Sequence, residues 1–306
     1  MRLTIRRWLA FVVLVCFLFT LPLGAGAQEE NTGWFHGTLD MLAQQPESVD
    51  EWYHFLLIGT DTRQNVENAG RSDTMIIASV LPREGRIKLA SLARDMWVTI
   101  PGEGENKLNA AHSWGGPDLL LETINQNFHM NLTDYVSVNF YGLIDIIDAM
   151  GGVEVEITSA EAGVINNSVA KEHPYAEVTR LMEGKAHLCG VQALSYARIR
   201  KLDSDFGRTS RQRKLIGAML DKVSHLNPLQ LMDVAAKCMD AVTFRMGSDG
   251  YQLMGMLYGL EEKGLDGIEE LSLPSRFRYH SNDGISKLLI DPEQVEQEWH
   301  AFVYGE

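Results

Sequence analysis

Short apolar segments alternate with helix-like segments between residues 54 and 157, and this alternation limits the possible folds more than any other feature of the sequence. A run of about four to eight apolar residues bounded by glycine or turn residues is typical of a buried strand, whereas apolar residues at helical spacing indicate a helix. Strands interleaved with helices predict an α/β domain whose sheet is covered on both sides. The predicted strands are HFLLIG (54–59), DTMIIASVLP (73–82), GRIKLASLARD (85–95), YVSVNF (135–140) and GGVEVEI (151–157), and the predicted helices are PDLLLETINQNFHM (117–130) and YGLIDIIDAM (141–150).

The second half of the chain predicts three more helices and shows no change of composition that would mark a second domain. The segment from 207 to 228 has a capping box at Thr209 and Gln212, followed by an apolar stripe and the stop signal Asn227-Pro228. We therefore expect one domain over residues 53–306. The three predicted helices are LCGVQALSYARIR (188–200), GRTSRQRKLIGAMLDKVSHLNP (207–228) and PEQVEQEWHAFVYG (292–305).

The N-terminus has the pattern of an export segment. Three arginines within the first seven residues precede an uncharged run from 8 to 27. That run just reaches the length of about 20 residues that a membrane-spanning helix needs, and its end, Ala25-Gly26-Ala27, also resembles a signal-peptidase site. Residues 1–27 are therefore either a retained anchor or a cleaved signal peptide, and 28–52 form a polar stalk. We expect the domain on the extracytoplasmic face of the cell membrane if the anchor is retained, and secretion if the signal peptide is cleaved.

The overall charge argues against nucleic acid as a partner, because the formal net charge is −14 and nucleic-acid-binding proteins present broad basic faces. Of the three cysteines, Cys16 lies in the apolar N-terminal run. Cys189 and Cys238 remain, and in an oxidising compartment they form either a disulfide or two buried thiols.

Positive charge is concentrated in one segment. From Arg198 to Lys214 the sequence RIRKLDSDFGRTSRQRK carries seven basic residues and two acidic ones. Close cations repel one another, so the segment is expected to face an anion. With the helix beginning at Thr209, Arg211 falls in its first turn, where backbone N–H groups and guanidinium groups together favour phosphate.

Arginines and carboxylates also lie side by side in GTDTR, GRSDT and SLARD, each next to a predicted strand end or loop. A single pair of this kind is most often a surface salt bridge of little energetic value. Three pairs at strand ends instead suit a Mg²⁺ ion that bridges carboxylates to a pyrophosphate. The sequence has no Walker A, nucleophile-elbow, H-E-x-x-H or C-x-x-C motif, and its nine histidines are scattered.

Several ordered blocks, spread over about residues 53 to 304, resemble the LytR-CpsA-Psr family. They are FLLIGTDTR, GRSDTMIIASV, IKLASLARDMWVTIPG, KLNAAHSWGG, IDAMGGVEVEI, QALSYARIRKLDSDFGRTSRQRKLI and the C-terminal VYG. The resemblance implies one catalytic domain with a three-layer α-β-α fold, a mixed central sheet and a membrane anchor. It also implies an enzyme that transfers a polyprenyl-pyrophosphate-linked glycopolymer, such as teichoic acid or capsule, to peptidoglycan as a phosphodiester with the help of Mg²⁺.

Site residues follow from the same resemblance, position by position. The expected catalytic residues are Asp61, Asp73, Arg94, Arg198 and Arg200. The expected pyrophosphate-binding residues are Arg63, Arg71, Lys107, Arg208, Arg211 and Gln212. Asp61 and Asp73 are expected to hold Mg²⁺ or to orient the attacking hydroxyl. Two alternatives remain open: a hydrolase of polyprenyl pyrophosphates, and a scaffold that binds them without catalysis.

Overall fold

The computed structural model describes residues 52–61, 70, 72–81, 84–200, 202–203, 205–226, 228–245, 268–281 and 286–305. The chain divides into two compact units, of which the larger comprises His54–Ser79, Lys88–Gly247 and Ile268–Glu306. The predicted export segment lies outside the described residues, as does the stalk up to residue 51. Within the described part of the chain, no helix is long and apolar enough to span a membrane.

A six-stranded mixed sheet forms the centre of the fold, in the order β10-β3-β2-β1-β6-β9. β1 pairs with β6 in parallel, and β6 pairs with β9 in antiparallel orientation. The predicted strands 54–59, 73–82, 85–95 and 135–140 are all present as members of this sheet. Its strands are β1 (Tyr53–Thr60), β2 (Ser72–Leu81), β3 (Arg86–Leu92), β6 (Asp134–Asn139), β9 (Val242–Arg245) and β10 (Ile268–Leu273).

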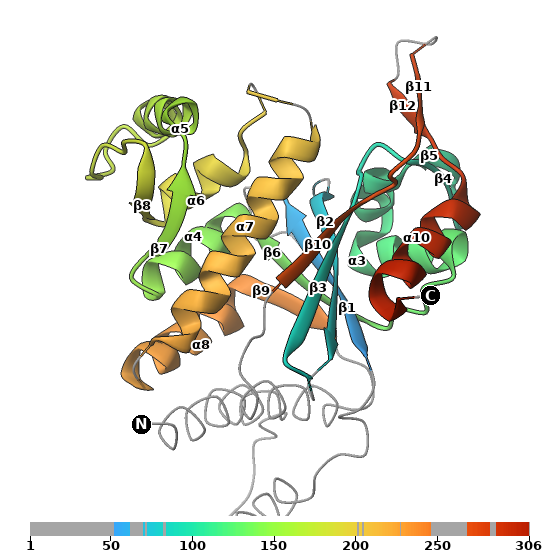
Figure 1. Cartoon of the computed structure of the whole chain (residues 1–306), viewed down its shortest axis with the longest axis horizontal. Coiled ribbons are helices and arrows are strands. Elements are labelled where there is room, and N and C mark those ends of the chain that lie inside the picture. The colour runs from blue at the N-terminus through green and yellow to red at the C-terminus, as the bar shows by residue number, and fades with distance from the viewer. Residues whose placement is uncertain are drawn as a thin grey trace, which may run out of the picture. The chain divides into compact units, whose positions relative to one another are not determined.

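Helices lie on both sides of the sheet, which confirms the predicted α/β class (Figure 1). Helices α4, α6, α7 and α8 lie on one side, and α3 and α10 on the other. The helices are α3 (Leu108–Phe128), α4 (Phe140–Ala149), α5 (Ser159–Glu172), α6 (Gly190–Ala197), α7 (Asp205–Ser224), α8 (Pro228–Ala241) and α10 (Pro292–Tyr304). Three two-stranded antiparallel sheets complete the described elements: β4 (Trp97–Ile100) with β5 (Gly104–Lys107), β7 (Val153–Ile157) with β8 (Gly184–Leu188), and β11 (Arg278–His280) with β12 (Lys287–Leu289).

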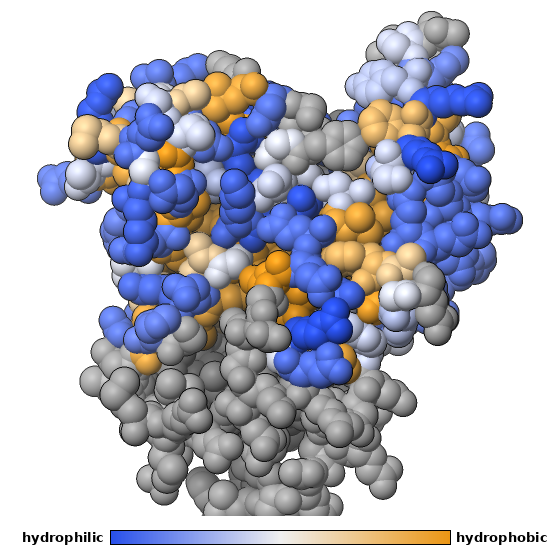
Figure 2. Space-filling model, viewed as in Figure 1, coloured by the Kyte–Doolittle hydropathy of each residue, from blue (hydrophilic) through white to orange (hydrophobic). Residues whose placement is uncertain are grey.

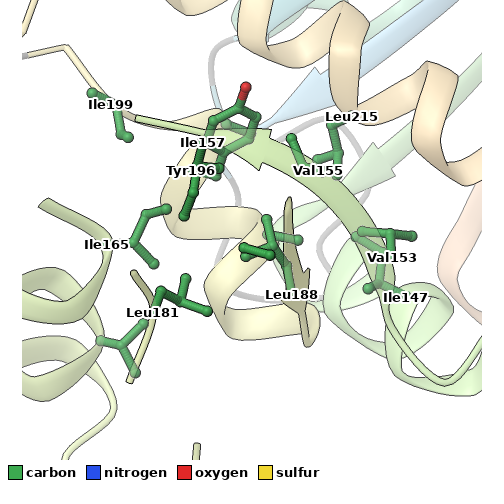
Figure 3. Packing of buried hydrophobic residues seen from close by; sticks show 14 of the residues in the cluster. Ile147, Val153, Val155, Ile157, Ile165, Leu181, Leu188, Tyr196, Ile199 and Leu215 are labelled. Carbon is green, nitrogen blue, oxygen red and sulfur yellow. The ribbon is translucent and has the colours of Figure 1, made fainter. Parts of the chain in front are cut away.

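The apolar residues that recur at strand or helix spacing in the sequence pack together in a common core. In β7 the residues alternate between buried and exposed, as the pattern GGVEVEI predicts. Their buried side chains join a cluster that includes Ile147 of α4, Ile165 of α5 and Tyr196 of α6 (Figure 3). The face of the molecule seen in Figure 2 is mostly hydrophilic, with apolar side chains gathered around its centre.

Two helices begin earlier than predicted. α3 starts at Leu108 and contains a kink, because Gly115 and Gly116 have non-helical backbone angles. The predicted start at Pro117 is thus the start of the second helical segment only. α7 starts at Asp205, so the capping box predicted at Thr209 is wrong.

The early start of α7 overturns one argument about anion binding. Arg211 lies well inside the helix and not in its first turn. Tertiary packing explains the longer helix, since Arg208 in its first turns is only 2% exposed and donates to the backbone oxygen of Asp73.

The expected alternative of a disulfide between Cys189 and Cys238 is not realised, since the structure contains both as thiols. Cys189 caps the N-terminus of α6, and Cys238 lies on α8 beside the core cluster. Both helices pack against α4. Both thiols are half-buried, whereas the alternative from the sequence was two buried thiols.

Candidate active site

The expected catalytic carboxylates lie at neighbouring strand ends. Asp61 directly follows β1, and Asp73 is the second residue of β2. The two strands are adjacent in the sheet, and a Cβ atom added at Gly59 would lie 2.9 Å from Cβ of Thr74. β1 and β2 therefore place both carboxylates at the same end of the sheet, as the sequence predicts.

Three arginines that are far apart in the sequence converge on Asp73. Arg94 Nη1 lies 2.6 Å from Oδ1 of Asp73, and Arg200 Nη2 lies 2.8 Å from Oδ2. Arg208 Nη2 donates to the backbone oxygen of Asp73 at 3.2 Å. A loop after β3, the segment after α6 and the first turns of α7 thus meet at one residue of β2.

A second carboxylate, Asp95, extends this group of residues, which we call the Asp73 cluster. It consists of Asp73, Arg94, Asp95, Lys107, Arg200 and Arg208. Asp95 accepts from Lys107 Nζ at 2.8 Å and lies 3.7 Å from Nε of Arg94. Lys107 ends β5 and precedes α3, so the β4–β5 hairpin supplies it. The side chains of Arg94, Lys107 and Asp95 are between 20% and 25% exposed, so a ligand from solvent can reach them.

The sequence placed Asp95 among the three pairs of arginine and aspartate, through SLARD, but the family resemblance assigned it no role.

His112 of α3 was also not expected near the site. Its Nδ1 lies 3.1 Å from the backbone oxygen of Gly70, which can only accept, so Nδ1 carries the proton. Burial lowers the pKa of His112, although the bond to Gly70 and the charge of nearby Asp61 act to raise it. A neutral His112 therefore borders Asp61. The signal that separates it from the other eight histidines is its position in KLNAAHSWGG, one of the blocks that resemble the family.

Arg198 adjoins the Asp73 cluster in sequence but has partners of its own. It caps the C-terminus of α6, and its Nη1 lies 2.8 Å from Oε2 of Glu172. Its guanidinium carbon lies 4.7 Å from the ring centroid of Phe140, a cation–π contact. At 37% exposure, the Arg198 side chain remains accessible to a ligand.

Of the remaining residues expected to bind pyrophosphate, the described ones are not part of the Asp73 cluster. Gln212 is 8% exposed and donates weakly to the backbone of Ala197 at 3.5 Å, and its buried Oε1 has no hydrogen-bond partner among the described residues. Arg211 is held by Glu161 and Asp203, outside the Asp73 cluster. Binding of pyrophosphate by these two residues stays a prediction. Arg63 and Arg71 lie outside the described residues.

Chemically, this cluster suits a substrate with phosphate oxygens. Guanidinium groups hold such oxygens through paired N–H donors, and a partly exposed position allows them to exchange a carboxylate for a ligand. Among the described residues no three His, Cys, Asp or Glu side chains are grouped so that they could hold a metal ion by themselves.

Comparison with known proteins agrees with this geometry. The model of the LytR_cpsA_psr family matches residues 26–302. Over 226 residues the chain is 37% identical to the polyisoprenyl-teichoic acid–peptidoglycan teichoic acid transferase TagU of Enterococcus faecalis, covering 71% of this chain and 70% of that protein. It is 35% identical to TagU of Halalkalibacterium halodurans, over 84% of this chain and 78% of the relative.

A solved structure has the same fold. It is described as the LytR-CPS2A-psr family protein YwtF (TagT) with bound octaprenyl pyrophosphate lipid. The match has a TM-score of 0.62 at 22% identity and covers 85% of this chain and 94% of that one.

Proposed function

Since the chain belongs to the LytR-CpsA-Psr family, we propose that it is a transferase that attaches a polyprenyl-pyrophosphate-linked glycopolymer to peptidoglycan through a phosphodiester bond. The observation that carries this proposal is the convergence of Arg94, Arg200 and Arg208 on Asp73 at the end of the sheet. Peptidoglycan is proposed as the acceptor because the two TagU relatives transfer teichoic acid to it, and a polyprenyl pyrophosphate is proposed as the donor lipid because the TagT structure binds octaprenyl pyrophosphate.

The chemistry of the reaction explains why arginines dominate the site. A hydroxyl oxygen of a peptidoglycan sugar attacks the glycan-proximal phosphorus, and the bond from that phosphorus to the bridging oxygen breaks. Polyprenyl phosphate leaves, and the hydroxyl proton passes to one of the carboxylates, Asp61 or Asp73. Negative charge that develops on the leaving phosphate is stabilised by the guanidinium groups, so no protein nucleophile is needed.

Mg²⁺ is part of the proposal. Asp61 and Asp73 offer carboxylate oxygens at one end of the sheet, and Mg²⁺ usually binds one or two carboxylates together with waters and substrate phosphates. These two residues therefore fit the ion without a third protein ligand. When bound, Mg²⁺ would neutralise charge on the pyrophosphate. The protein groups position the donor and accept the proton.

We further propose that the domain works at the outer face of the cell membrane. The donor is a lipid, so an enzyme that stays near the bilayer meets its substrate more often. Retention of residues 1–27 as an anchor is the arrangement that fits this requirement.

The test uses residues 28–306 with a polyprenyl-pyrophosphate oligosaccharide, Mg²⁺ and peptidoglycan fragments, with products followed by mass. A joined glycan is expected. Sugar phosphate released without joining would identify a hydrolase, and an unchanged but bound lipid would identify a scaffold. Omission of Mg²⁺ tests the metal separately, since the joined product should then fall by at least about tenfold.

A matched pair of arginines sharpens this test. Arg200 and Arg245 each form one ion pair at 2.8 Å, with Asp73 and Asp118 respectively, and their side chains are 48% and 53% exposed. R200A is expected to lower kcat/KM by about 10³-fold, because it removes charge stabilisation at the reacting phosphate. R245A should leave it within about twofold. Equal activities of the two variants would contradict the assigned site.

A further inference from the structure

Arg211 has a buried position that its place in the basic segment does not suggest. Its side chain is 6% exposed. Nε donates to Oε1 of Glu161 at 2.7 Å, Nη2 donates to Asp203, and Nη1 donates to the backbone oxygen of Ile199 at 3.1 Å. All three nitrogens of the guanidinium group are thus engaged by protein groups, which explains why Arg211 does not join the Asp73 cluster.

The bond to Ile199 matters because Ile199 lies between the two expected catalytic arginines, Arg198 and Arg200. The chain leaves α6 here: the nitrogen of Arg198 donates to the oxygens of Leu194 and Ser195, and the nitrogen of Ile199 donates to the oxygen of Tyr196 at 3.3 Å. The side chain of Ile199 is 2% exposed and lies at one end of the core cluster (Figure 3). Arg211 therefore fixes the backbone from one side while the core fixes the side chain from the other.

Glu161 is one of the two carboxylates that pair with the buried Arg211, and its two oxygens accept from different donors. Oε2 accepts from the backbone nitrogen and the hydroxyl of Thr158 at 2.9 and 3.0 Å, which completes the capping box of α5. Oε1 accepts from Arg211. Burial acts to raise the pKa of Glu161, but the hydrogen bonds from Thr158 and Arg211 outweigh it and lower the pKa, so the carboxylate is ionised at neutral pH.

We infer that Glu161 and Arg211 are positioning residues for the transfer reaction: α5 holds Arg211 through Glu161, and Arg211 holds the segment that carries Arg198 and Arg200. This inference rests on the proposed function. Its physical basis is that a guanidinium group displaced by about 1 Å loses much of its stabilisation of a transition state. Glu161 touches neither substrate nor reacting atoms and acts only through Arg211.

The first test is E161Q in the exported domain, with T158A as the matched control. E161Q keeps the size of the side chain but removes the negative charge that faces Arg211. We therefore expect kcat/KM to fall by about 10- to 100-fold. T158A weakens the same helix cap without touching Arg211. It should lower Tm by the amount typical of a weakened helix cap and leave kcat/KM within about twofold. If T158A lost activity as E161Q does, the effect would be one of stability and the inference would be wrong.

A double mutant separates positioning from a general loss of structure. In the R200A background, one of the two arginines that Glu161 is inferred to position is absent. E161Q should therefore lower kcat/KM by less than about threefold in that background. If the losses of kcat/KM caused by R200A and by E161Q multiplied fully in the double mutant, the inference would be wrong.

R211K provides a second variant in case E161Q does not fold. A lysine keeps the charge but cannot serve three acceptors as a fork does, and the same 10- to 100-fold loss is expected. Full activity of folded R211K would also overturn the inference. A wild-type domain that joins no glycan at all would instead contradict the proposed function.

Discussion

At the scale of the residue, the site depends on one carboxylate with several cationic neighbours. Asp73 has 22% side-chain exposure, and each of its oxygens faces a different arginine. Its negative charge offsets the repulsion between Arg94 and Arg200 while the donor is absent. Asp73 therefore orders the arginines as well as being a candidate for proton acceptance and metal binding.

D73N tests this double role. The amide keeps the shape but removes the charge, so both arginines lose an ionic partner and the proposed reaction loses a carboxylate. Transfer should fall by at least about 10²-fold, measured as the joined product per unit time. The control is D118N, which removes the exposed partner of Arg245 and should leave transfer unchanged. If D73N remained active, Asp73 could not be the residue that accepts the hydroxyl proton, and of the two carboxylates only Asp61 would remain as a candidate.

A second residue, His54, gives the fold a pH dependence that is separate from the site. It lies in β1, with Nδ1 2.9 Å from Ser79 Oγ and Nε2 3.0 Å from the hydroxyl of Tyr304. Burial, followed by the charge of nearby His300, lowers the pKa of His54 to about 4. The folded protein thus holds this ring neutral where the unfolded chain would protonate it.

Because the folded-state pKa lies below the ordinary value of 6.5, the unfolded state binds the proton first as pH falls. The stabilisation from His54 is complete above about pH 6.5 and is lost between that pH and about 4, by at most about 3 kcal/mol. Urea unfolding at several pH values measures this loss. H54Q should flatten the curve in that interval, and an unchanged slope would refute the assignment to His54.

At the scale of the element, α3 depends on the backbone freedom of one glycine. Gly116 has φ 68° and ψ −161°, angles that are essentially restricted to glycine, and it separates the two helical segments. The first segment carries His112 toward Asp61, and the second packs Leu120 and Ile124 into the core. The kink lets one helix serve both the site and the core.

Substitution of glycine should have opposite effects in α3 and α5. G116A is expected to lower the free energy of unfolding by about 1–3 kcal/mol, because alanine is strained at these angles. Gly163 lies exposed inside α5, and nothing lies within 4 Å of an added Cβ atom. G163A should therefore raise stability by about 0.5–1 kcal/mol. Chemical denaturation measures both, and a G116A variant as stable as wild type would show that the kink is not needed.

At the scale of the whole molecule, the expected site residues are confined to the first 212 residues, yet the described fold requires the C-terminus as well. α10 contributes Val295, Trp299 and Val303 to the core, each at most 2% exposed. The buried Lys88 of β3 donates to the backbone oxygens of Phe302 and Val303 at the end of this helix. Removal of α10 would expose one side of the sheet.

Truncation after Asp291 should therefore prevent folding, since three buried apolar side chains together stabilise by about 5–9 kcal/mol, comparable to the stability of a whole domain. Removal of Gly305 and Glu306 alone should be tolerated, because Tyr304 ends the helix. Circular dichroism and soluble yield compare the two chains. A folded truncation after Asp291 would contradict this view of α10.

The sequence by itself determined the α/β class, the positions of the main strands and the chemical character of the site. Periodicity of apolar residues is a local property, and so is the placement of Asp61, Asp73 and Arg94 beside strand ends. The bounds of the helices were less predictable, since the start of α7 depends on the burial of Arg208 against Asp73.

Only the tertiary structure decided the partner of each arginine in the basic segment. Arg208 contacts Asp73 in β2, Arg211 contacts Glu161 in α5, and Arg213 lies 2.8 Å from Glu270 in β10. At about 100° per residue, Arg211 points about 60° away from Arg208 and Arg213 about 140° away from it, so the three side chains meet different elements. Which element lies on each side of the helix depends on contacts between residues up to 135 positions apart, as for Arg208 and Asp73, and no local pattern contains that information.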